Sequence, residues 1–596
     1  IMPLNSLGRS IFNNNDIQLN LPDSRFKVDI PVKNSFMMGR LIPIGTPIET
    51  LKNDKFTISL SGLIRTGSAM IAPILDDMYI DIYCIFVPKR IVWNHMAQFL
   101  GENDATAWTQ AAELEEPTFV YKGNTGSTGT LILPSSVSVG NYYLDAHFGL
   151  PYAVNQLAGD IKITALMHRG YYEIWNRYFR YTEWQRPVLY SKENNGAQGE
   201  FGYSLDAFDI YNTSGTVAES IAAGTSFTYK LPVLMPVNRF YDSATSIKPE
   251  PQFGSAVDIF GDGLAPIIAG ASHDVELGQP MTWKDSTSGT AITGQFLVGT
   301  SPVNNRGATV FTNKDLQNSD NIFTSRGYGV PDNLYANIAL DVSKLRSAVL
   351  LQNFKQAIGR TDARVDSILQ LLFGPGKSGF EDDRPRLLNH YRQRIGVNQI
   401  VATADSSNTT ATSHLGETGA YSITALSCDL TSYKFNEPGY IYTLAAVRQI
   451  NTYSQGIPEA FLRYKFWDQY NPFVDKIGMV PFKAIYINAA SDEGLVLGYQ
   501  EAHYSYKSNR GIAVGALNPA ITDAFNFWTL GTVFPNYRTS QGIGPGFFIQ
   551  GPEQLDRCLL ANHNVSPQFI GDFRITGISS RKMSVHGDSL VLGMRL

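Results

Sequence analysis

The sequence predicts a mainly β protein, an antiparallel β-sandwich or jelly roll with long inserted loops and a few α-helices. Alternation of apolar and polar residues, which is typical of half-buried strands, occurs at 55–87 and again across 399–592. Helical and loop-rich stretches lie between these two regions. Strands that are distant in sequence must therefore pair, which favours a sandwich over repeated strand–helix–strand units.

Two strands are expected in the first hundred residues. Apolar and small polar residues alternate cleanly at 55–65, which predicts a strand with one buried face. At 78–87 one face is wholly apolar and the other mixes tyrosine and aliphatic residues with Asp81, which predicts a long core strand. Pro88 ends it, because proline has no backbone N–H to donate, and a short helix-like run is expected at 92–100.

The chain divides into four stretches. Residues 1–35 are polar and irregular, and they are expected to form an N-terminal arm that orders on a partner or neighbouring subunit. Residues 36–189 contain the first strands and a helix at 163–186. Residues 190–330 are rich in Ser, Thr, Gly, Asn and Ala, and they predict a large folded or partner-stabilised insertion. Residues 331–596 contain helices and the remaining strands, so the sandwich is expected to be one discontinuous domain.

The predicted helix at 163–186 has a broad apolar stripe and a charged face with Arg169, Glu173, Arg177 and Arg180. Glu173 can pair with an arginine one turn before or after it, which favours a solvated, salt-bridged face. The alternative for this face is contact with nucleic acid.

Other helices and strands are expected along the remaining chain. Helical periodicity occurs at 142–148, 342–359 and 362–373. The strand-like runs of the C-terminal part lie at 399–404, 420–426, 439–453, 480–488, 495–506 and 569–592.

The composition restricts the function classes. Only 17% of the residues are charged, while 12% are aromatic and 43% are hydrophobic, so much of the surface is expected to face other protein. The alternative is an ordinary large β protein with Gly and Thr in place of charge. The net charge is −5, so the chain as a whole lacks the positive charge of a protein that binds nucleic acid through its overall field. Any contact with nucleic acid must come from a local patch.

The three cysteines, Cys84, Cys428 and Cys558, are far apart and have no CxxC spacing. They predict neither a disulfide framework nor a zinc site, and they fit a reducing compartment. No apolar run approaches 18 residues and no signal-peptide core is present, so neither membrane insertion nor secretion is expected.

Catalytic and cofactor motifs are not found. The GPGKSG run at 374–379 lacks the first glycine of a phosphate-binding loop, where Leu371 stands, and it follows a helix instead of a strand. The carboxylate pairs at 76–77 and 382–383 could in principle act on glycans. Adjacent strand residues point to opposite faces, however, so turn chemistry and local capping are the favoured interpretation. No metal and no cofactor are expected.

One constellation combines basic and aromatic residues, which together can neutralise phosphates and stack bases. It occurs in AHYSYKSNR at 502–510 and in the last predicted strand. The candidate DNA contacts are Tyr504, Tyr506, Lys507, Arg510, Arg581 and Lys582, with Arg574 beside the last two. The alternative is that these residues line the rim of a protein interface.

Seven segments, in order, resemble the major capsid proteins of small single-stranded DNA phages, the Microviridae, and especially their gokushovirus-like branch. The stretch at 65–93 resembles the family pattern of an arginine, a proline-bounded segment, a D-x-x-Y/H-x-D strand, F-V-P and V-W. The other segments are GRLIP, RGYYEIWNRYFR, LRSAVLLQNF, NEPGYIYTLAAVRQINTYSQGI, GYQEAHYSYKSNR and DFRITGISSRKMSVHG. YTEWQRPV replaces the continuation usual after the helix, and 190–330 shows no match.

The resemblance implies an eight-stranded viral jelly roll with long inserted loops, assembled as a T=1 icosahedral shell of 60 copies. It implies that the protein is a structural component of the virion and no enzyme, assembled in the host bacterial cytoplasm. The implied partners are packaged circular single-stranded DNA, an internal scaffolding protein and a DNA pilot protein. The insertion at 190–330 is the candidate for a surface protrusion and for contact with a host cell-surface receptor.

The alternative function is a secreted β-sandwich protein that binds or cleaves glycans. Within the family pattern, Asp81 becomes a required position of a central strand. We expect it to pair with a basic group, with Arg65 as the candidate.

Overall fold

The computed structural model describes most of the chain outside the two termini and the predicted insertion. The described residues are 22–100, 116–121, 144–150, 161–185, 187–190, 192, 201–202, 234–254, 267–269, 283–285, 291–292, 296–300, 308–312, 329–331, 334–336, 342–361, 364–376, 383–401, 406–408, 411–413, 418–474, 478–521, 525–538 and 544–585. The chain forms two compact units, of which one combines residues 1–251 with 358–596 and the other is 252–357.

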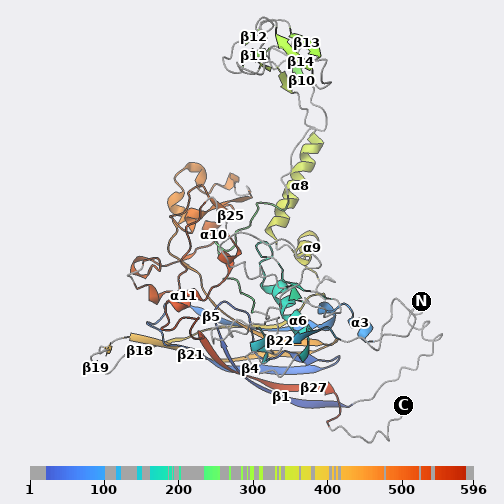
Figure 1. Ribbon diagram of the computed structural model, residues 1–596, viewed down its shortest axis with the longest axis vertical. Helices are drawn as coiled ribbons and strands as arrows, with labels where there is room; N and C mark the ends of the chain where they lie inside the picture. Colours follow the sequence, from blue (N-terminus) through green and yellow to red (C-terminus); the bar gives the residue numbers. More distant parts are fainter. Residues whose placement is uncertain are drawn as a thin grey trace, which may run out of the picture. The chain divides into compact units, whose positions relative to one another are not determined.

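Two antiparallel sheets form the body of the larger unit and pack as a sandwich (Figure 1). The first has the order β1 (Asp23–Phe36), β27 (Phe569–Lys582), β4 (Lys55–Thr66), β21 (Thr418–Lys434), β18 (Val397–Val401). The second has the order β17 (Arg386–Arg394), β5 (Met78–Pro88), β22 (Gly439–Gln449), β2 (Ile42–Pro43), and β3 (Ile48–Thr50) also pairs with β22. The predicted antiparallel β-sandwich is confirmed. The count of eight strands stays a prediction.

Strands that are distant in sequence pair, as the sequence predicts, since β4 lies between β27 and β21. β1 and β27 pair over their whole lengths, from Asp23 opposite Lys582 to Phe36 opposite Phe569. The prediction of an irregular arm is therefore wrong for 23–35, while residues 1–21 lie outside the described residues. Pro31 is tolerated because β1 is an edge strand with β27 as its one neighbour in the sheet.

The core lies between the two sheets and is rich in aromatic rings. β4 alternates as predicted, with Phe56, Ile58, Leu60 and Ile64 all buried. Phe435, which directly follows β21, packs against the Phe56 ring at 6.0 Å and against the Phe86 ring at 4.7 Å, so it joins strands of both sheets.

β5 is buried on both faces, because a helical segment covers the face that points away from the other sheet. That segment is α6 (Leu166–Ile174), which continues as the π-helix η2 (Trp175–Phe179). The Tyr442 hydroxyl of β22 donates to the Met167 carbonyl at 2.6 Å. Gly170 is needed at this crossing, since a Cβ there would lie 2.2 Å from the Tyr442 hydroxyl.

The predicted helix at 163–186 is shorter than expected, and its charged face is only partly solvated, since Arg177 is exposed. Residues 161–164 are strand β7 (Ile161–Thr164), paired with β6 (Thr118–Tyr121). Arg169 and Glu173 are 0% and 4% exposed, because surrounding elements bury this side of the helix as well. The predicted pair of Glu173 with Arg177 does form, at 2.9 Å.

Shorter elements complete the larger unit. In place of one helical run at 92–100 there are two single turns, α2 (Lys89–Val92) and α3 (Met96–Phe99). The remaining helices are α5 (Leu144–Phe148), α9 (Val365–Phe373), α10 (Tyr504–Lys507) and α11 (Glu553–Asp556). The remaining strands are β8 (Leu189–Tyr190), β9 (Phe201–Gly202), β19 (Ser406–Asn408), β20 (Ala411–Ser413), β23 (Thr452–Tyr453), β24 (Met479–Lys483), β25 (Val496–Glu501) and β26 (Gly511–Ile512). Single 3₁₀ turns are η4 (Glu459–Leu462), η5 (Phe466–Asp468), η6 (Pro472–Val474), η7 (Ala484–Tyr486), η8 (Gly515–Leu517), η9 (Asn526–Trp528) and η10 (Pro545–Phe548).

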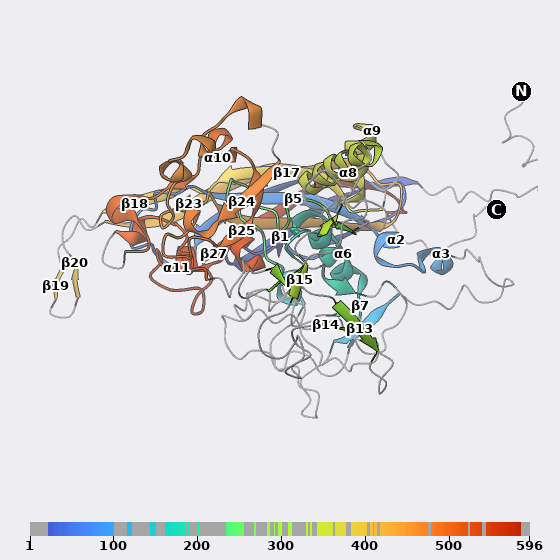
Figure 2. The same cartoon turned by 90° about the horizontal axis from the view of Figure 1, so that it is seen from above.

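The C-terminal loops form a layer over the sheet that contains β5 (Figures 1 and 2). They have their own apolar cluster around Phe482, Phe534 and Phe548. The segment 234–254 joins this layer through backbone hydrogen bonds between Lys248 and Tyr499, each 2.8 Å.

The smaller unit contains short antiparallel pairings and most of helix α8 (Val342–Arg360). Its strands are β10 (Ile267–Ala269), β11 (Trp283–Asp285), β12 (Ala291–Ile292), β13 (Phe296–Thr300), β14 (Ala308–Thr312), β15 (Gly329–Pro331) and β16 (Leu334–Ala336). Much of the predicted insertion at 190–330 lies outside the described residues, so its boundaries stay a prediction. No described helix is both long and apolar enough to cross a bilayer.

Candidate functional site

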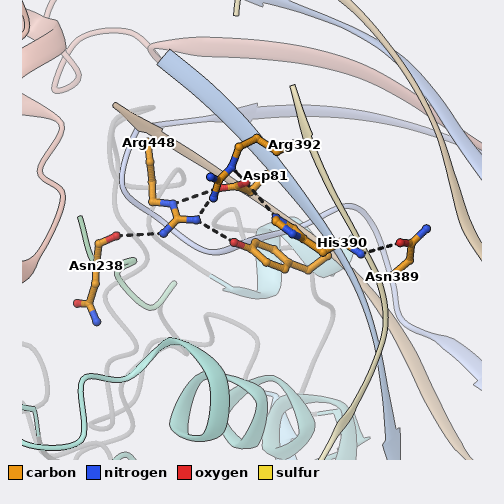
Figure 3. Close-up of polar contacts among 7 residues, drawn as sticks. Asp81, Asn238, Asn389, His390, Arg392 and Arg448 are labelled. Atoms are coloured by element: carbon orange, nitrogen blue, oxygen red, sulfur yellow. Dashed lines mark hydrogen bonds and ion pairs between the residues drawn. The ribbon is translucent and has the colours of Figure 1, made fainter. Parts of the chain in front are cut away.

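A buried charge cluster centres on Asp81, in the middle of β5 (Figure 3). Arg392 of β17 donates its Nε–H to the Asp81 carboxylate at 2.6 Å, and Arg448 of β22 donates its Nε–H at 3.1 Å. His390 Nε2 lies 3.0 Å from the same carboxylate. The predicted pairing with Arg65 is wrong, because Arg65 is exposed and lies on β4 of the opposite sheet.

Strand register explains why these residues meet. Asp81 lies directly opposite Arg392 on one neighbour, and Arg448 on the other neighbour is diagonal to it. The guanidinium groups of both arginines lie over the Phe240 ring, at 4.5 and 4.3 Å from its centre. Arg448 also donates to the Tyr83 hydroxyl at 2.9 Å. The cluster thus joins three strands and the 234–254 segment.

The electrostatics keep Asp81 ionised. Burial alone raises the pKa of a carboxyl group, but the charge of Arg448 and the hydrogen bonds from Arg392, Arg448 and His390 together lower the pKa of Asp81 below its ordinary value. The hydrogen bond to Asp81 raises the pKa of Arg392 in turn. Burial raises the pKa of Tyr83 to about 12. The cluster compensates a buried carboxylate with charged partners from both neighbouring strands, so we assign it a structural role.

The carboxylate pairs found in the sequence also have structural roles. Asp76 accepts hydrogen bonds from the Thr452 hydroxyl at 2.8 Å and from the Leu530 amide at 2.5 Å. Asp77 pairs with Arg394, and Asp383 with Arg90 at 2.8 Å. These partners are distant in sequence, so the three carboxylates hold tertiary contacts and the predicted local capping is wrong for them. Asp382 lies outside the described residues. Within the described part of the chain, no three His, Cys, Asp or Glu side chains are grouped as metal ligands.

The first group of predicted DNA contacts lies on and after α10. Residues 504–507 form this helical turn, so the predicted strand at 495–506 ends early, as β25. Tyr506 and Lys507 are exposed, and Lys507 Nζ lies 3.4 Å from a Glu501 carboxylate oxygen. Tyr504 is half-buried. Arg510 is largely buried and bonds to Glu459 and to the Tyr486 carbonyl, each at 3.1 Å.

The second group lies at the end of β27. Arg581 lies 3.3 Å from the Asp54 carboxylate and over the Phe56 ring, whereas Lys582 is exposed. α10 lies in the loop layer and β27 in the sheet on the other side of the sandwich, so the two groups do not form one patch (Figure 1). Arg510 and Arg581 are held by contacts within the chain. DNA contact by any of the six residues stays a prediction.

An exposed aromatic loop, residues 457–474, was missed in the sequence because it has no periodicity. Phe461, Tyr464, Phe466 and Phe473 are 79%, 76%, 70% and 96% exposed. The loop packs on α10, with the Arg463 guanidinium 4.1 Å from the centre of the Tyr506 ring. The available signal was the density of aromatic residues in PEAFLRYKFWDQYNPFV. Several exposed aromatic side chains on one loop are typical of a protein interface.

Comparison with known proteins decides the class. A family described as capsid protein (F protein) matches residues 17–591. The chain belongs to this capsid protein family. It is 25% identical to capsid protein VP1 of Spiroplasma virus 4 over 94% of each chain, and 26% identical to capsid protein VP1 of Chlamydia phage 1 over 93% of each. It is 24% identical to capsid protein VP1 of Bdellovibrio phage phiMH2K over 96% of each.

Membership confirms the resemblance to the Microviridae major capsid proteins. The family is structural, so this capsid protein is a virion component and no enzyme, and the alternative of a secreted glycan-binding or glycan-cleaving protein is wrong. A capsid protein assembles with copies of itself into a shell. The Asp81 cluster and the aromatic loop are therefore parts of a shell subunit.

Replacing Asp81 with asparagine should lower the free energy of unfolding by about 3–5 kcal/mol, because Arg448 then stays buried without its counter-charge. Denaturant unfolding of the dissociated subunit measures this. Asp29→Asn is the matched control, because Asp29 pairs with Arg574 on the solvent-facing edge strand. Loss of this exposed ion pair should leave the denaturant midpoint of unfolding unchanged. Equal midpoints for Asp81→Asn and wild type would contradict the assigned role.

The stability difference between wild type and Asp81→Asn should depend on pH. The folded-state pKa of Asp81 is lowered, so its stabilisation is present above the ordinary carboxyl pKa of about 4 and is lost as the pH falls through the folded-state value. The stability difference between wild type and Asp81→Asn should stay constant from about pH 7 to about pH 5 and shrink in more acidic solution. A difference that grew on acidification would contradict this sign.

Proposed function

We propose that this capsid protein is the repeating subunit of a T=1 icosahedral shell of 60 copies that encloses circular single-stranded DNA. The observation that carries the proposal is the family match along nearly the whole chain, at near-equal length to the relatives. One sandwich with strands from both chain ends supplies a rigid subunit, and closed symmetry stops growth at a finite size.

The aromatic loop is the proposed contact between neighbouring subunits. Phe473 is 96% exposed, and an aromatic side chain so placed leaves a large apolar area in water until a partner covers it. Aromatic residues are enriched at the centres of interfaces, where a few of them provide most of the binding free energy. A second copy of this chain is the occupant that shell assembly provides.

Other partners follow from the same proposal. Lys507, Tyr506 and Lys582 are the exposed members of the predicted DNA contacts, and they would neutralise phosphates and stack bases without sequence preference. An internal scaffolding protein and a DNA pilot protein are the proposed assembly partners in the host bacterial cytoplasm. The insertion at 190–330 is the proposed protrusion that contacts the host receptor.

Particles purified from infected cells should contain nucleic acid that resists added nuclease until the shells are dissociated. Digestion with a nuclease specific for single strands, after dissociation, should remove it completely. Particles without protected nucleic acid, or with double-stranded nucleic acid, would contradict the proposed cargo.

Phe461→Ser/Phe473→Ser should reduce shell yield at least about tenfold, because two interface aromatic groups are lost. Sedimentation separates shells from subunits, and an unchanged thermal transition of the dissociated subunit shows that the fold is intact. Leu560→Ser removes a 72% exposed apolar side chain elsewhere and is the control. Equal shell yields for the double variant and wild type would show that the aromatic loop is not part of the subunit interface.

Deleting residues 195–325 should leave particles that assemble but fail to adsorb to host cells. Particle yield and adsorption are measured on the same preparation. Loss of assembly would show instead that the insertion is an element of the subunit interface.

A further inference from the structure

The first sheet of the sandwich has one face that no described element covers. Along β4, β21 and β27, buried residues that point into the core alternate with residues that are exposed or half-buried. In Figure 1 this sheet lies on the side of the sandwich away from α6 and the loop layer. We call its outward surface the open face. It consists of the odd-numbered residues 23–35 of β1, the even-numbered residues 570–582 of β27, the odd-numbered residues 55–65 of β4 and residues 421, 423, 425, 427, 429, 432 and 434 of β21.

Positive charge dominates the open face, although the whole chain has a net charge of −5. Eight cationic side chains stand beside four carboxylates: Arg25, Lys27, Lys33, Lys55, Arg65, Lys434, Arg574 and Lys582 beside Asp23, Asp29, Asp429 and Asp572. Asp29 pairs with Lys27 at 3.0 Å and with Arg574 at 2.7 Å. The other six cations form no ion pair with any described carboxylate. Most of the positive charge of this face is therefore not neutralised within the subunit.

Strand register places three of these six cations in one row across the sheet. Lys55 of β4 lies directly opposite Lys434 of β21. On its other side Lys55 lies opposite Ser580 of β27, which lies opposite Arg25 of β1. The row thus spans four strands, or about 14 Å, and Lys582 follows Ser580 on the same face. Like charges directly opposite each other destabilise an antiparallel pair, so a bound anion would relieve a repulsion that the free subunit retains.

The size and polarity of the open face favour a long anion over a small one. Lys55 and Arg65 stand near the two ends of β4, about 33 Å apart for a strand of this length. Between them lie hydroxyl groups that can donate to phosphate, those of Thr57, Ser59, Ser61, Ser427, Ser432 and Thr576. The exposed apolar side chains of this face, at Leu63, Tyr421, Ile423 and Ile578, are interspersed with these polar groups. A polymer with many phosphates would contact both ends of the face, whereas a single phosphate would contact only a part of it.

We propose that the open face binds the sugar–phosphate backbone of single-stranded DNA, with phosphates at Arg25, Lys55, Lys434 and Lys582. The choice of ligand rests on the proposed enclosure of DNA. An acidic protein is the other polyanion that such a face could bind. Interfaces with nucleic acid are more polar and much more positively charged than interfaces between proteins, in which lysine is depleted. The row of cations therefore favours the nucleic acid.

The salt dependence of binding by the purified full-length subunit tests this proposal, with a twenty-nucleotide oligothymidylate as the probe. Each phosphate of a single strand that a cation neutralises contributes about −0.7 to the slope of log K against log salt concentration. Four such contacts predict a slope of about −3. Absence of saturable binding, or a slope near zero, overturns the proposal. We expect the oligonucleotide to bind more tightly than a twenty-residue polyglutamate, and equal binding of the two would assign the face to an acidic protein instead.

Lys55→Gln/Lys434→Gln should reduce the magnitude of this slope by about 1.4, because two phosphate contacts are lost. Arg25→Gln/Lys582→Gln should give the same reduction, so the test does not depend on one double variant. Lys465→Gln/Lys483→Gln makes the same change of charge at exposed positions of the loop layer and is the matched control, which should leave the slope unchanged. Equal reductions by all three double variants would mean general attraction to the protein and contradict the site.

The thermal transition of the free subunit separates loss of binding from loss of folding. It should not fall in Lys55→Gln/Lys434→Gln, because the substitutions remove a pair of like charges. A wild-type slope in a folded Lys55→Gln/Lys434→Gln subunit would contradict the role of the row. Shell formation is scored separately, by microscopy, so loss of the proposal for the open face leaves the shell proposal standing, and the reverse also holds.

Discussion

The buried carboxylate of Asp81 is the interaction on which the arrangement of the central sheet depends. It is 0% exposed, and its cationic partners come from both neighbouring strands. A buried carboxylate without such partners would be strongly unfavourable, so the three strands have to keep their register for the charge to be accommodated. Arg448 also bonds to the Tyr83 hydroxyl and to the Asn238 carbonyl, so the charge cluster connects this sheet to the 234–254 segment.

The same sheet shows how the chain accommodates the long segment between β5 and β17. β5 ends at Pro88, and the chain returns as β17 with Arg386 paired opposite Phe86. The chain therefore leaves this sheet after Pro88 and re-enters it at Arg386, beside the point where it left. The entropic cost of closing a loop grows only slowly with its length. The sheet therefore tolerates the long segment between β5 and β17 as long as these two strands stay paired. This topology lets α6 pack on the sheet while β5 and β17 stay paired.

Local pattern was enough to predict the strands whose two faces differ. β4 was predicted because its buried residues alternate with small polar ones, and Asp81 was identified as unusual because it stands on an otherwise apolar strand. Its partners could not be predicted, since Arg392 and Arg448 are 311 and 367 positions away and only strand register brings them together. β1 was missed because Pro31 and its many polar residues are typical of loops as well as of edge strands. The burial of Arg169 and Glu173 was missed because a charged side chain predicts an exposed position. Only the structure shows which elements cover this side of the helix.

The capsid class could be predicted because seven matching segments in order are specific even when no single motif is. Cryo-electron microscopy of purified particles tests the central claim most directly. The account predicts closed icosahedral shells of 60 copies, with the aromatic loop, including Phe473, buried at the boundary between subunits. Uniform monomers, or shells in which this loop faces solvent on every copy, would contradict it.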